Sequence, residues 1–344
     1  MKAAVLTGIR QMEIIDMPDP VIENNTDVLL KIEMVGVCGS DVHYYEMGNI
    51  GTQVVKYPFV VGHECAATVK AVGKNVTRVK QGDRVVVDPA IVCHNCDQCN
   101  AGRENTCRNI KFLGCPGQIG GCLCEYMIMP QNCCYPVSND FSLANCVMCE
   151  PLTIGYYCVQ QAALKENADI AILGSGPIGL SCLLNVQTKK INACYMTDKI
   201  DFRAATANRA GAAWAGNPDK TNIVEAILAQ QPAGMDVVFE CAGQQDTLDQ
   251  ALELLKPGGK LVMVGIPRQE RVTFVIDKMR RKEITIVNIR RQNNCTKKCI
   301  DIITDGKINA DFMFTHSFKL ADAQKAFDMV ANYDDGVIKA MIEI

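Results

Sequence analysis

The apolar residues follow two different patterns, and the change between them comes near Thr153. Before this point, short runs rich in Val are separated by Gly and Asp turn signals, as in a β-rich protein. These runs predict strands at residues 1–6, 28–37, 65–72 and 83–88. Because no long stretch here has the 3.6-residue period of an amphipathic helix, we expect an all-β unit, curled or barrel-like.

Beyond Thr153, buried strands alternate with helices. Apolar runs predict strands at residues 168–173, 193–197, 236–240 and 260–264. The segments between them predict helices at residues 177–187, 202–210 and 247–255. Strands separated by helices indicate βαβ units and a parallel sheet, which residues 284–289 would complete. The chain is expected to close with helices at 295–304 and 321–331 and a strand at 337–344.

The composition is that of an ordinary globular protein. Of the 344 residues 48% are hydrophobic, and the net charge of −3 excludes the basic surface of a nucleic-acid-binding protein. The longest uncharged apolar stretch, residues 170–186, is broken by glycines and a proline, so it suits a buried strand and helix better than a membrane span. The first residues lack the apolar core of a signal peptide. We therefore expect a cytoplasmic protein with no membrane partner.

Nineteen cysteines are many for this length. A disulfide framework belongs to short secreted chains, so we expect reduced thiols here. Seven of the cysteines lie among apolar neighbours, where cysteine acts as a small hydrophobic residue. These are Cys133, Cys134, Cys146, Cys158, Cys182, Cys194 and Cys241.

A glycine-rich turn follows the strand predicted at 168–173 and opens the next helix. Its G-x-G-x-x-G pattern contains Gly174, Gly176, Pro177, Ile178 and Gly179. In this context the glycines permit a tight turn, close approach of a pyrophosphate and close packing of helix on strand. The N-terminus of the helix then favours the phosphates. The turn therefore predicts a dinucleotide site, and the alternative is an α/β domain without a nucleotide.

Asp198 ends the next strand, close to the position of an acid that binds a ribose 2′-hydroxyl. Its carboxylate would repel a 2′-phosphate, which favours NAD over NADP. Arg203 lies nearby and would either loosen that preference or lie along the adenine side.

Four cysteines fall within fifteen residues of a polar loop. They are Cys93, Cys96, Cys99 and Cys107. This spacing predicts a closed tetrahedral site for structural zinc, although spacing alone also permits an iron–sulfur cluster or four thiols without metal. We interpret His94 as a bystander, because adjacent residues rarely share a small metal site.

Residues 36–64 gather a second set of metal-binding side chains. Cys38 is followed by Ser40 and His43, and the stretch ends in the sequence Gly-His63-Glu64. A thiolate, an imidazole and a carboxylate are the mixed donors of an open zinc site, which keeps one position for water or substrate. The alternative is a buried cysteine with two hydrogen-bonded histidines.

These motifs together resemble the zinc-dependent medium-chain dehydrogenases over essentially the whole chain. The similarity includes Gly62-His63-Glu64, the four-cysteine lobe, residues 82–85, the turn at Gly174 and residues 256–259. Residues 38–51 and 149–152 are similar to the sorbitol (polyol) dehydrogenase branch. The resemblance implies an α/β fold with a discontinuous, β-rich GroES-like catalytic domain at 1–152 and 288–344. A Rossmann domain with a doubly wound parallel sheet is implied at 153–287, with the active site in the cleft between the domains.

The resemblance also implies a role for each matching residue near the catalytic zinc. Cys38, His63 and Glu64 would be ligands, and Glu150 would contact either the zinc or its water. Asp41 would orient the imidazole of His63. Ser40 and His43 would pass the alcohol proton outward, since an imidazole titrates in a suitable range. With the four-cysteine lobe this makes two zinc ions per chain, one catalytic and one structural.

Further roles concern the cofactor and the substrate. Val264, Gly265 and Ile266 would line the nicotinamide end of NAD. Asn288, Ile289 and Arg290 would form a returning segment that touches both cofactor and substrate. Tyr44, Glu150, Arg290 and Arg291 are the candidate substrate contacts. Arg291 stands where sorbitol dehydrogenases often carry Tyr, and residues 113–115 depart from the more aromatic segment of animal members.

Three hypotheses follow for the function. The first is a zinc-dependent oxidation of a secondary alcohol of a polyol such as sorbitol or xylitol by NAD, giving a ketose. The second changes the substrate to L-threonine or another secondary alcohol of the butanediol type. The third is a non-catalytic protein that interacts through its zinc lobe. The family resemblance further implies a homotetramer.

Overall fold

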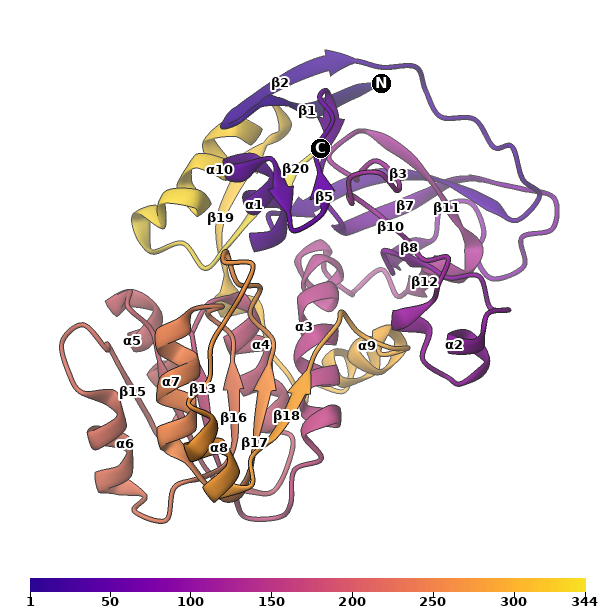
Figure 1. Ribbon diagram of the computed structural model, residues 1–344. Helices are drawn as coiled ribbons and strands as arrows, with labels where there is room; N and C mark the ends of the chain where they lie inside the picture. The colour runs from indigo at the N-terminus through magenta and orange to yellow at the C-terminus, as the bar shows by residue number, and fades with distance from the viewer. The chain divides into compact units, whose positions relative to one another are not determined.

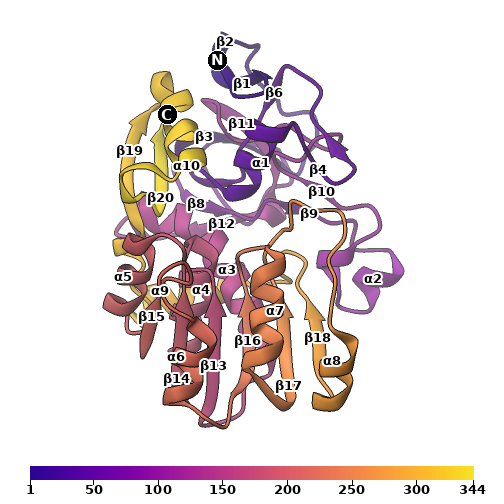
Figure 2. The ribbon, with the colours of Figure 1, turned by 60° about the vertical axis from the view of Figure 1, so that its left-hand side comes forward.

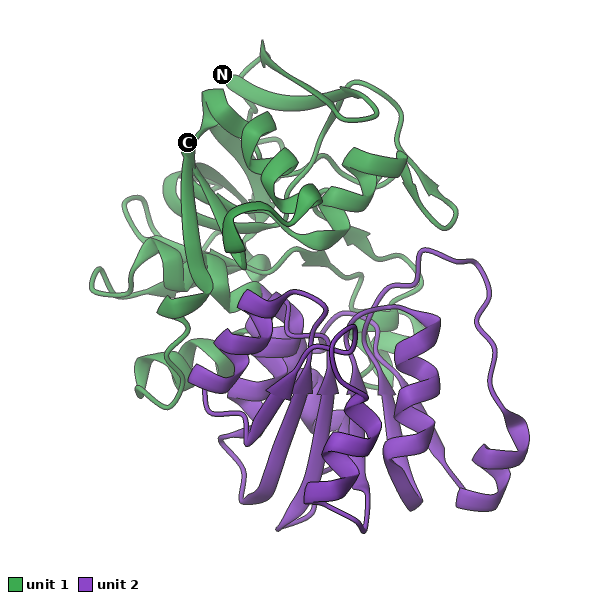
Figure 3. Cartoon of the chain, turned by 90° about the vertical axis from the view of Figure 1, so that its left-hand side faces the viewer, with its two compact units in different colours: residues 1–150, 296–344 green, residues 151–295 purple.

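The computed structural model describes residues 1–344 and divides into two compact units, which Figure 3 colours separately. Unit 1 comprises Met1–Glu150 and Thr296–Ile344, and unit 2 comprises Pro151–Cys295. The sequence instead predicts domain boundaries at 152/153 and 287/288. Residues 289–295 fall in unit 2, where Ile289 N–H donates to Met263 O. None of the helices combines the length and apolar character that crossing a membrane requires.

Strand β3 (Asp27–Gly36) is the centre of unit 1. It pairs antiparallel with β7 (Glu64–Val72) along one side, in a register that sets Gly36 opposite Glu64. On its other side it pairs first with β11 (Tyr126–Pro130) and then with β20 (Lys339–Glu343), where Met341 lies opposite Gly36. The C-terminal strand is therefore two strands away from the Gly-His-Glu motif.

The remaining strands and helices of unit 1 surround this sheet (Figure 1). Two strands extend it, β8 (Arg84–Val87) and β12 (Cys134–Val137), and β19 (Phe314–Lys319) pairs with β20. The other strands are β1 (Lys2–Gly8), β2 (Gln11–Asp16), β4 (Asn49–Ile50), β5 (Gln53–Val54), β6 (Phe59–Val60), β9 (Ala90–Ile91) and β10 (Lys111–Phe112). The helices are α1 (Gly39–Met47), α2 (Asp97–Asn100), α9 (Thr296–Thr304) and α10 (Ala323–Asn332).

The prediction that the first half is all-β was wrong at α1 and at α3 (Leu143–Ala162). Helix α3 has 20 residues and is buried along most of its length, so its sequence lacks the polar face that reveals a helix. Helix α1 is short and follows Cys38, and it ends at Gly48, whose φ of 71° is in the left-handed region. A Cβ at Gly48 would lie 3.1 Å from Ile9 and Tyr57 atoms, which favours glycine there.

Unit 2 contains a parallel sheet of six strands flanked by helices (Figure 2). Its order is β15-β14-β13-β16-β17-β18, which is the strand order of a doubly wound dinucleotide-binding fold. The strands are β13 (Ala168–Leu173), β14 (Ile191–Thr197), β15 (Trp214–Gly216), β16 (Met235–Glu240), β17 (Leu255–Met263) and β18 (Thr285–Asn288). The helices are α4 (Pro177–Val186), α5 (Asp201–Arg209), α6 (Ile223–Gln230), α7 (Gln245–Leu254) and α8 (Ile276–Lys282). The predicted fold class, with its parallel sheet, is confirmed.

Burial agrees with the interpretation of the surplus cysteines. All nineteen cysteines are free thiols. Six of the seven singled out from the sequence are buried, and Cys241 is half-buried. They fill the cores as small hydrophobic side chains would.

Candidate metal and dinucleotide sites

Cys38, His63 and Glu64 form a cluster in unit 1, in which His63 and Glu64 are buried and Cys38 is half-buried. Their ligand atoms all lie within 4.8 Å of one another. Cys38 precedes the first residue of α1, and Glu64 is the first residue of β7. A Cβ at Gly36 would lie 2.3 Å from Glu64 Oε2, so the glycine leaves the carboxylate its space. One thiolate, one imidazole and one carboxylate at this separation fit an open zinc site.

Asp41 fixes the imidazole of His63. Its Oδ1 lies 3.3 Å from His63 Nδ1 and also accepts a hydrogen bond of 3.2 Å from Gly62 N–H. Holding Nδ1 in this way leaves Nε2 for a metal. Burial lowers the pKa of His63, but the charges of Asp41 and Cys38 outweigh burial and hold this pKa well above its usual value. The structure therefore places Asp41 beside the imidazole of His63, where the resemblance implies a residue that orients this imidazole.

Glu64 is also the partner of a buried lysine that the sequence did not reveal. Lys339 Nζ lies 2.9 Å from Glu64 Oε1 and 2.7 Å from Oε2, and both side chains are 1% exposed. Burial lowers the pKa of Lys339, but the charge of Glu64 outweighs burial and raises it. A lysine in a closing apolar strand would ordinarily be assigned to the surface.

Glu150 lies near this cluster but outside it. It is a buried residue of α3, and it is not among the three residues whose ligand atoms lie within 4.8 Å of one another. Burial raises its pKa to about 7, His63 opposes the rise and Glu64 adds to it. The charges of His63 and Glu64 thus affect the pKa of Glu150, although Glu150 is not one of the three clustered candidate ligands.

The other polar residues predicted around Cys38 lie on α1. The Ser40 hydroxyl donates to Cys38 Sγ over 3.4 Å, so it contacts a candidate ligand directly. His43 is half-buried one turn further along the helix. Tyr44 is buried, and its hydroxyl donates to Gln53 Oε1 over 3.2 Å.

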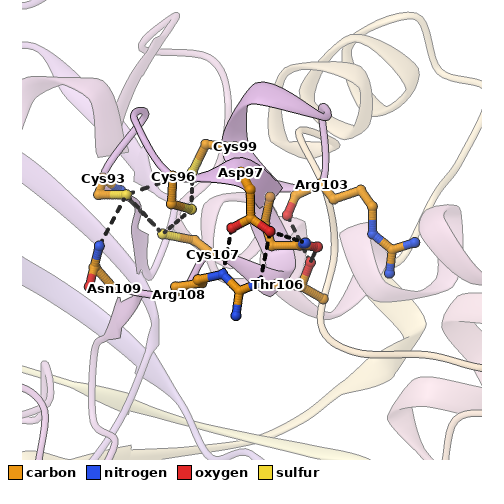
Figure 4. A network of polar contacts seen from close by, with 10 residues as sticks. Cys93, Cys96, Asp97, Cys99, Arg103, Thr106, Cys107, Arg108 and Asn109 are labelled. Carbon is orange, nitrogen blue, oxygen red and sulfur yellow. Dashed lines mark hydrogen bonds and ion pairs between the residues drawn. The ribbon is translucent and has the colours of Figure 1, made fainter.

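The four cysteines of the lobe converge on one point (Figure 4). Successive sulfur–sulfur distances are 3.4 Å for Cys93–Cys107, 3.6 Å for Cys96–Cys99 and 4.0 Å for Cys93–Cys99. These separations fit a closed tetrahedral S4 site, in which zinc–sulfur bonds are about 2.3 Å. His94 points elsewhere, with Nδ1 3.3 Å from Glu104 Oε1.

Local donors favour the thiolate form of Cys93, whereas burial raises the pKa of Cys99 to about 12. The backbone N–H of Asn95 and the Asn109 side chain hydrogen-bond Cys93 and lower its pKa to about 6. The Asn109 Nδ2–Cys93 Sγ distance is 3.6 Å. Asp97 and Arg108 form an ion pair across the loop, with a contact of 2.8 Å. Because the thiolate is the form of cysteine that binds metal, the lowered pKa of Cys93 favours metal binding in the lobe.

The loop between β13 and α4 has the geometry of a phosphate site. Gly174 has a φ of 104°, and a Cβ on Gly179 would lie 1.8 Å from Gly174 O, so neither position accepts a side chain. Pro177 is the first residue of α4, whose N-terminus faces the loop. The predicted roles of Gly174 in the tight turn and of Gly179 in the packing of helix on strand therefore have a steric reason in this unit.

Asp198 and Arg203 flank this loop. Asp198 accepts hydrogen bonds from Ser175 N–H at 2.8 Å and from Ile200 N–H at 2.9 Å, which holds its carboxylate at the end of β14. Arg203 is 8% exposed, and its Nη1 lies 3.4 Å from the point where a Cβ would sit on Gly176. The guanidinium thus faces the phosphate loop. This arrangement fits a dinucleotide with a free ribose 2′-hydroxyl.

The two segments predicted at the nicotinamide end follow neighbouring strands. Met263 pairs with Asn288, so Val264, Gly265 and Ile266 continue from β17 beside Ile289 and Arg290, which continue from β18. Arg291 has a φ of 54°, which is uncommon for a side chain of its size.

The sequence did not reveal Glu240, which braces the first of these segments. Its backbone oxygen accepts from Val264 N–H and Gly265 N–H, and its Oε1 accepts from Ala242 N–H and Gly243 N–H.

Comparisons with known proteins agree with the fold and with the family resemblance. Residues 24–139 match the family model described as alcohol dehydrogenase GroES-like domain, and residues 177–305 match that described as zinc-binding dehydrogenase. The chain is 33% identical to sorbitol dehydrogenase of Bacillus subtilis, over 99% of this chain and 97% of the relative. It is also 33% identical to L-idonate 5-dehydrogenase of Vitis vinifera, over 99% of this chain and 94% of that one.

A solved structure shows the same architecture. It is an Escherichia coli oxidoreductase/dehydrogenase of unknown specificity, with a TM-score of 0.94 and 32% sequence identity. The alignment covers 100% of this chain and 99% of that one.

Proposed function

This chain belongs to the zinc-binding alcohol dehydrogenase family, and we propose that it oxidises a secondary hydroxyl of a polyol to a ketone with NAD. The observation that carries the proposal is the cluster of Cys38, His63 and Glu64, with Asp41 hydrogen-bonded to the imidazole. The phosphate loop and Asp198 of unit 2 supply the nucleotide site of an NAD-linked zinc dehydrogenase. The names of the relatives, sorbitol dehydrogenase and L-idonate 5-dehydrogenase, support a polyhydroxylated substrate.

The residues of unit 1 divide the work of the reaction. Cys38, His63 and Glu64 would hold the catalytic zinc, and the four thiols of the lobe would hold the structural one. When bound, zinc is a Lewis acid for the substrate hydroxyl and NAD is the hydride acceptor. Ser40, already hydrogen-bonded to Cys38, would take the hydroxyl proton and pass it to His43.

Glu150 has a chemical role distinct from that of the three candidate ligands. It is buried beside them, and burial raises its pKa to about 7. A carboxyl group that titrates near neutral pH can accept or donate a hydrogen bond to a hydroxyl or to a water molecule. We therefore assign Glu150 to the substrate and its water. The substrate roles predicted for Tyr44, Arg290 and Arg291 rest on the sequence resemblance.

Two finer statements are part of the proposal. The family resemblance supports a homotetramer, and the chain is proposed to act in the cytoplasm. Light scattering on the purified protein tests the first, and fractionation of the producing cells tests the second. A monomer or a dimer in solution would contradict the tetramer.

A substrate screen tests the function. NAD reduction is measured with sorbitol, xylitol, galactitol, 2,3-butanediol and L-threonine, and NADP is compared with NAD on the best of them. We expect the highest kcat/KM on a polyol with NAD, and loss of turnover when zinc is removed. A higher kcat/KM on 2,3-butanediol or L-threonine would assign the chain to the alternative substrate. Activity that survives complete zinc removal would refute the mechanism.

Metal analysis separates the enzyme from a protein that interacts only through its zinc lobe. The enzyme should carry two zinc ions per chain and bind NAD. The Cys38→Ser variant should keep one zinc ion and the fold but lose turnover. One zinc ion in the unchanged chain, together with no NAD binding, would contradict the proposal.

A further inference from the structure

Lys339 is a buried cation whose three donors are all engaged. Its Nζ lies 2.9 and 2.7 Å from the two oxygens of Glu64 and 3.1 Å from Val37 O. An ammonium group has three N–H donors, so these three contacts use its full capacity. Both Lys339 and Glu64 are 1% exposed, and the ion pair is therefore shielded from water.

The position of this pair follows from the sheet. Glu64 opens β7 opposite Gly36, and β20 pairs with the other side of β3 at the same residue. Since Gly36 has no side chain, the carboxylate and the ammonium meet across β3. Lys339 thus reaches the cluster from the end of the chain, about 300 residues from Cys38 in sequence.

One oxygen of the same carboxylate also belongs to the candidate metal cluster. It lies within 4.8 Å of the ligand atoms of Cys38 and His63. The carboxylate of Glu64 can therefore bind two cations, the ammonium group of Lys339 and a divalent metal ion. A metal ion at the cluster would lie close to the ammonium group, and in a buried place two positive charges repel strongly.

We propose that Lys339 and the catalytic metal share Glu64, and that Lys339 is a positioning residue which weakens the bond between this carboxylate and the metal. The inference rests on the proposed metal site. Lys339 holds both carboxylate oxygens, so the metal can take Glu64 only by competing with an ion pair. A ligand held this way is readily released, which leaves a coordination position for a substrate hydroxyl.

A purely structural role would give a different result. Removing one partner of a buried ion pair leaves an uncompensated charge, so replacing a lysine with a purely structural role should destabilise the fold and loosen the placement of Glu64, which would leave metal affinity unchanged or weaker. Competition predicts instead that removing the lysine makes metal binding tighter. The direction of the change in metal affinity therefore distinguishes the two.

The experiment measures Co²⁺ and Zn²⁺ affinity of the full chain, with the four-cysteine lobe left filled and the catalytic site emptied. Competition with a chelator gives the dissociation constant, and the Co²⁺ absorption spectrum reports the ligand set. We expect Lys339→Met to bind metal about tenfold more tightly than the unchanged chain, a change of one decade in the constant. Lys339→Arg keeps the charge and should stay near the affinity of the unchanged chain. Unchanged or weaker binding by Lys339→Met would overturn the proposal.

Two further variants make the test specific. Lys282 in unit 2 also donates to three oxygens, the carbonyls of Leu252, Glu253 and Leu255, at 2.6–2.9 Å. Lys282→Met is the matched control and should leave metal affinity unchanged. In a Glu64→Gln background, adding Lys339→Met removes only the repulsion between the ammonium group and the metal, so it should tighten binding less than it does in the unchanged chain. Equal or greater tightening there would contradict sharing.

The outcomes also separate this inference from the proposed function. If the unchanged chain binds a single metal ion, the catalytic site itself fails. If it binds two and Lys339→Met has no effect, only the sharing of Glu64 fails. Should Lys339→Met not fold, Lys339→Gln replaces it, with the same expected tightening and the same contradicting result.

Discussion

The two candidate metal sites of unit 1 are built in opposite ways. The four-cysteine lobe takes all its sulfurs from a stretch of fifteen residues, and its hydrogen-bond donors come from the same loop. The Cys38 cluster takes its ligands from two separate segments, and its partners Asp41 and Lys339 come from α1 and the C-terminal strand. The lobe offers four like ligands and no open position, whereas the cluster offers three different ones.

The difference shows how structural and catalytic sites are distinguished. A closed site needs only spacing and local donors, so it can brace a loop without help from the rest of the fold. An open site must keep its protein ligands in place while water or substrate exchanges at the remaining coordination position. Residues from other parts of the fold therefore contact the ligands and fix their positions. Four predictions test this contrast.

The largest effect is expected for Cys38→Ser. Loss of the thiolate from the cluster should lower kcat/KM by at least about 1,000-fold, because a bound metal contributes several kcal/mol to stabilising the transition state. The circular dichroism spectrum should not change, and one metal ion per chain should remain in the lobe. A Cys38→Ser variant that retains substantial turnover would remove this cluster from the reaction.

Cys96→Ser should act mainly on stability. The lobe would lose one of four ligands, and metal binding there is coupled to the order of the loop. We expect the midpoint of thermal unfolding to fall by about 5–10 °C, corresponding to a few kcal/mol. Cys194→Ala, at a buried cysteine outside both clusters, is the control and should shift the midpoint much less. Equal shifts would mean that the lobe holds no structural metal.

Glu150→Gln should change how the stability of the metal-free chain depends on pH. Burial raises the pKa of Glu150 to about 7 from 4.5, so the folded state favours the protonated form. The stabilisation it contributes is present below pH 4.5 and is lost as the pH rises through 7. Glu150→Gln should therefore match the unchanged chain at pH 4.5 and be more stable by about 3 kcal/mol at pH 8. Denaturant unfolding at both pH values measures this difference, and a constant difference would refute it.

The smallest effects compare the outer partners of the two sites. Asp41→Asn removes the charge behind His63 and should weaken metal binding at the cluster by about 10–100-fold. Asn109→Ala removes one donor to Cys93 in the lobe, where the backbone N–H of Asn95 remains. Its effect on lobe affinity should therefore be less than about tenfold. Chelator competition on each site measures both, and a larger loss for Asn109→Ala would reverse the comparison.

Much of the fold could be predicted from local patterns. The βαβ order of unit 2, its glycine-rich turn and the strands predicted in unit 1 are confirmed, because burial on one or both faces leaves a readable period in the sequence. Strands β2, β11, β12 and β19 of unit 1 were not predicted. Helix α3 was missed because it is buried nearly all around and therefore has no polar face. Helix α1 was missed because only nine residues separate Cys38 from the glycine that ends it.

The sequence by itself determined the chemistry that each site can hold. Four thiols at fixed spacing, a glycine loop after a buried strand, and a Cys, a His and a Glu in one stretch limit the possible cofactors, whatever the fold. Only the tertiary structure decided which charges surround those groups. Lys339 reaches Glu64 because β20 and β7 pair with opposite sides of β3 at Gly36, and no local pattern encodes contacts between strands so distant in sequence.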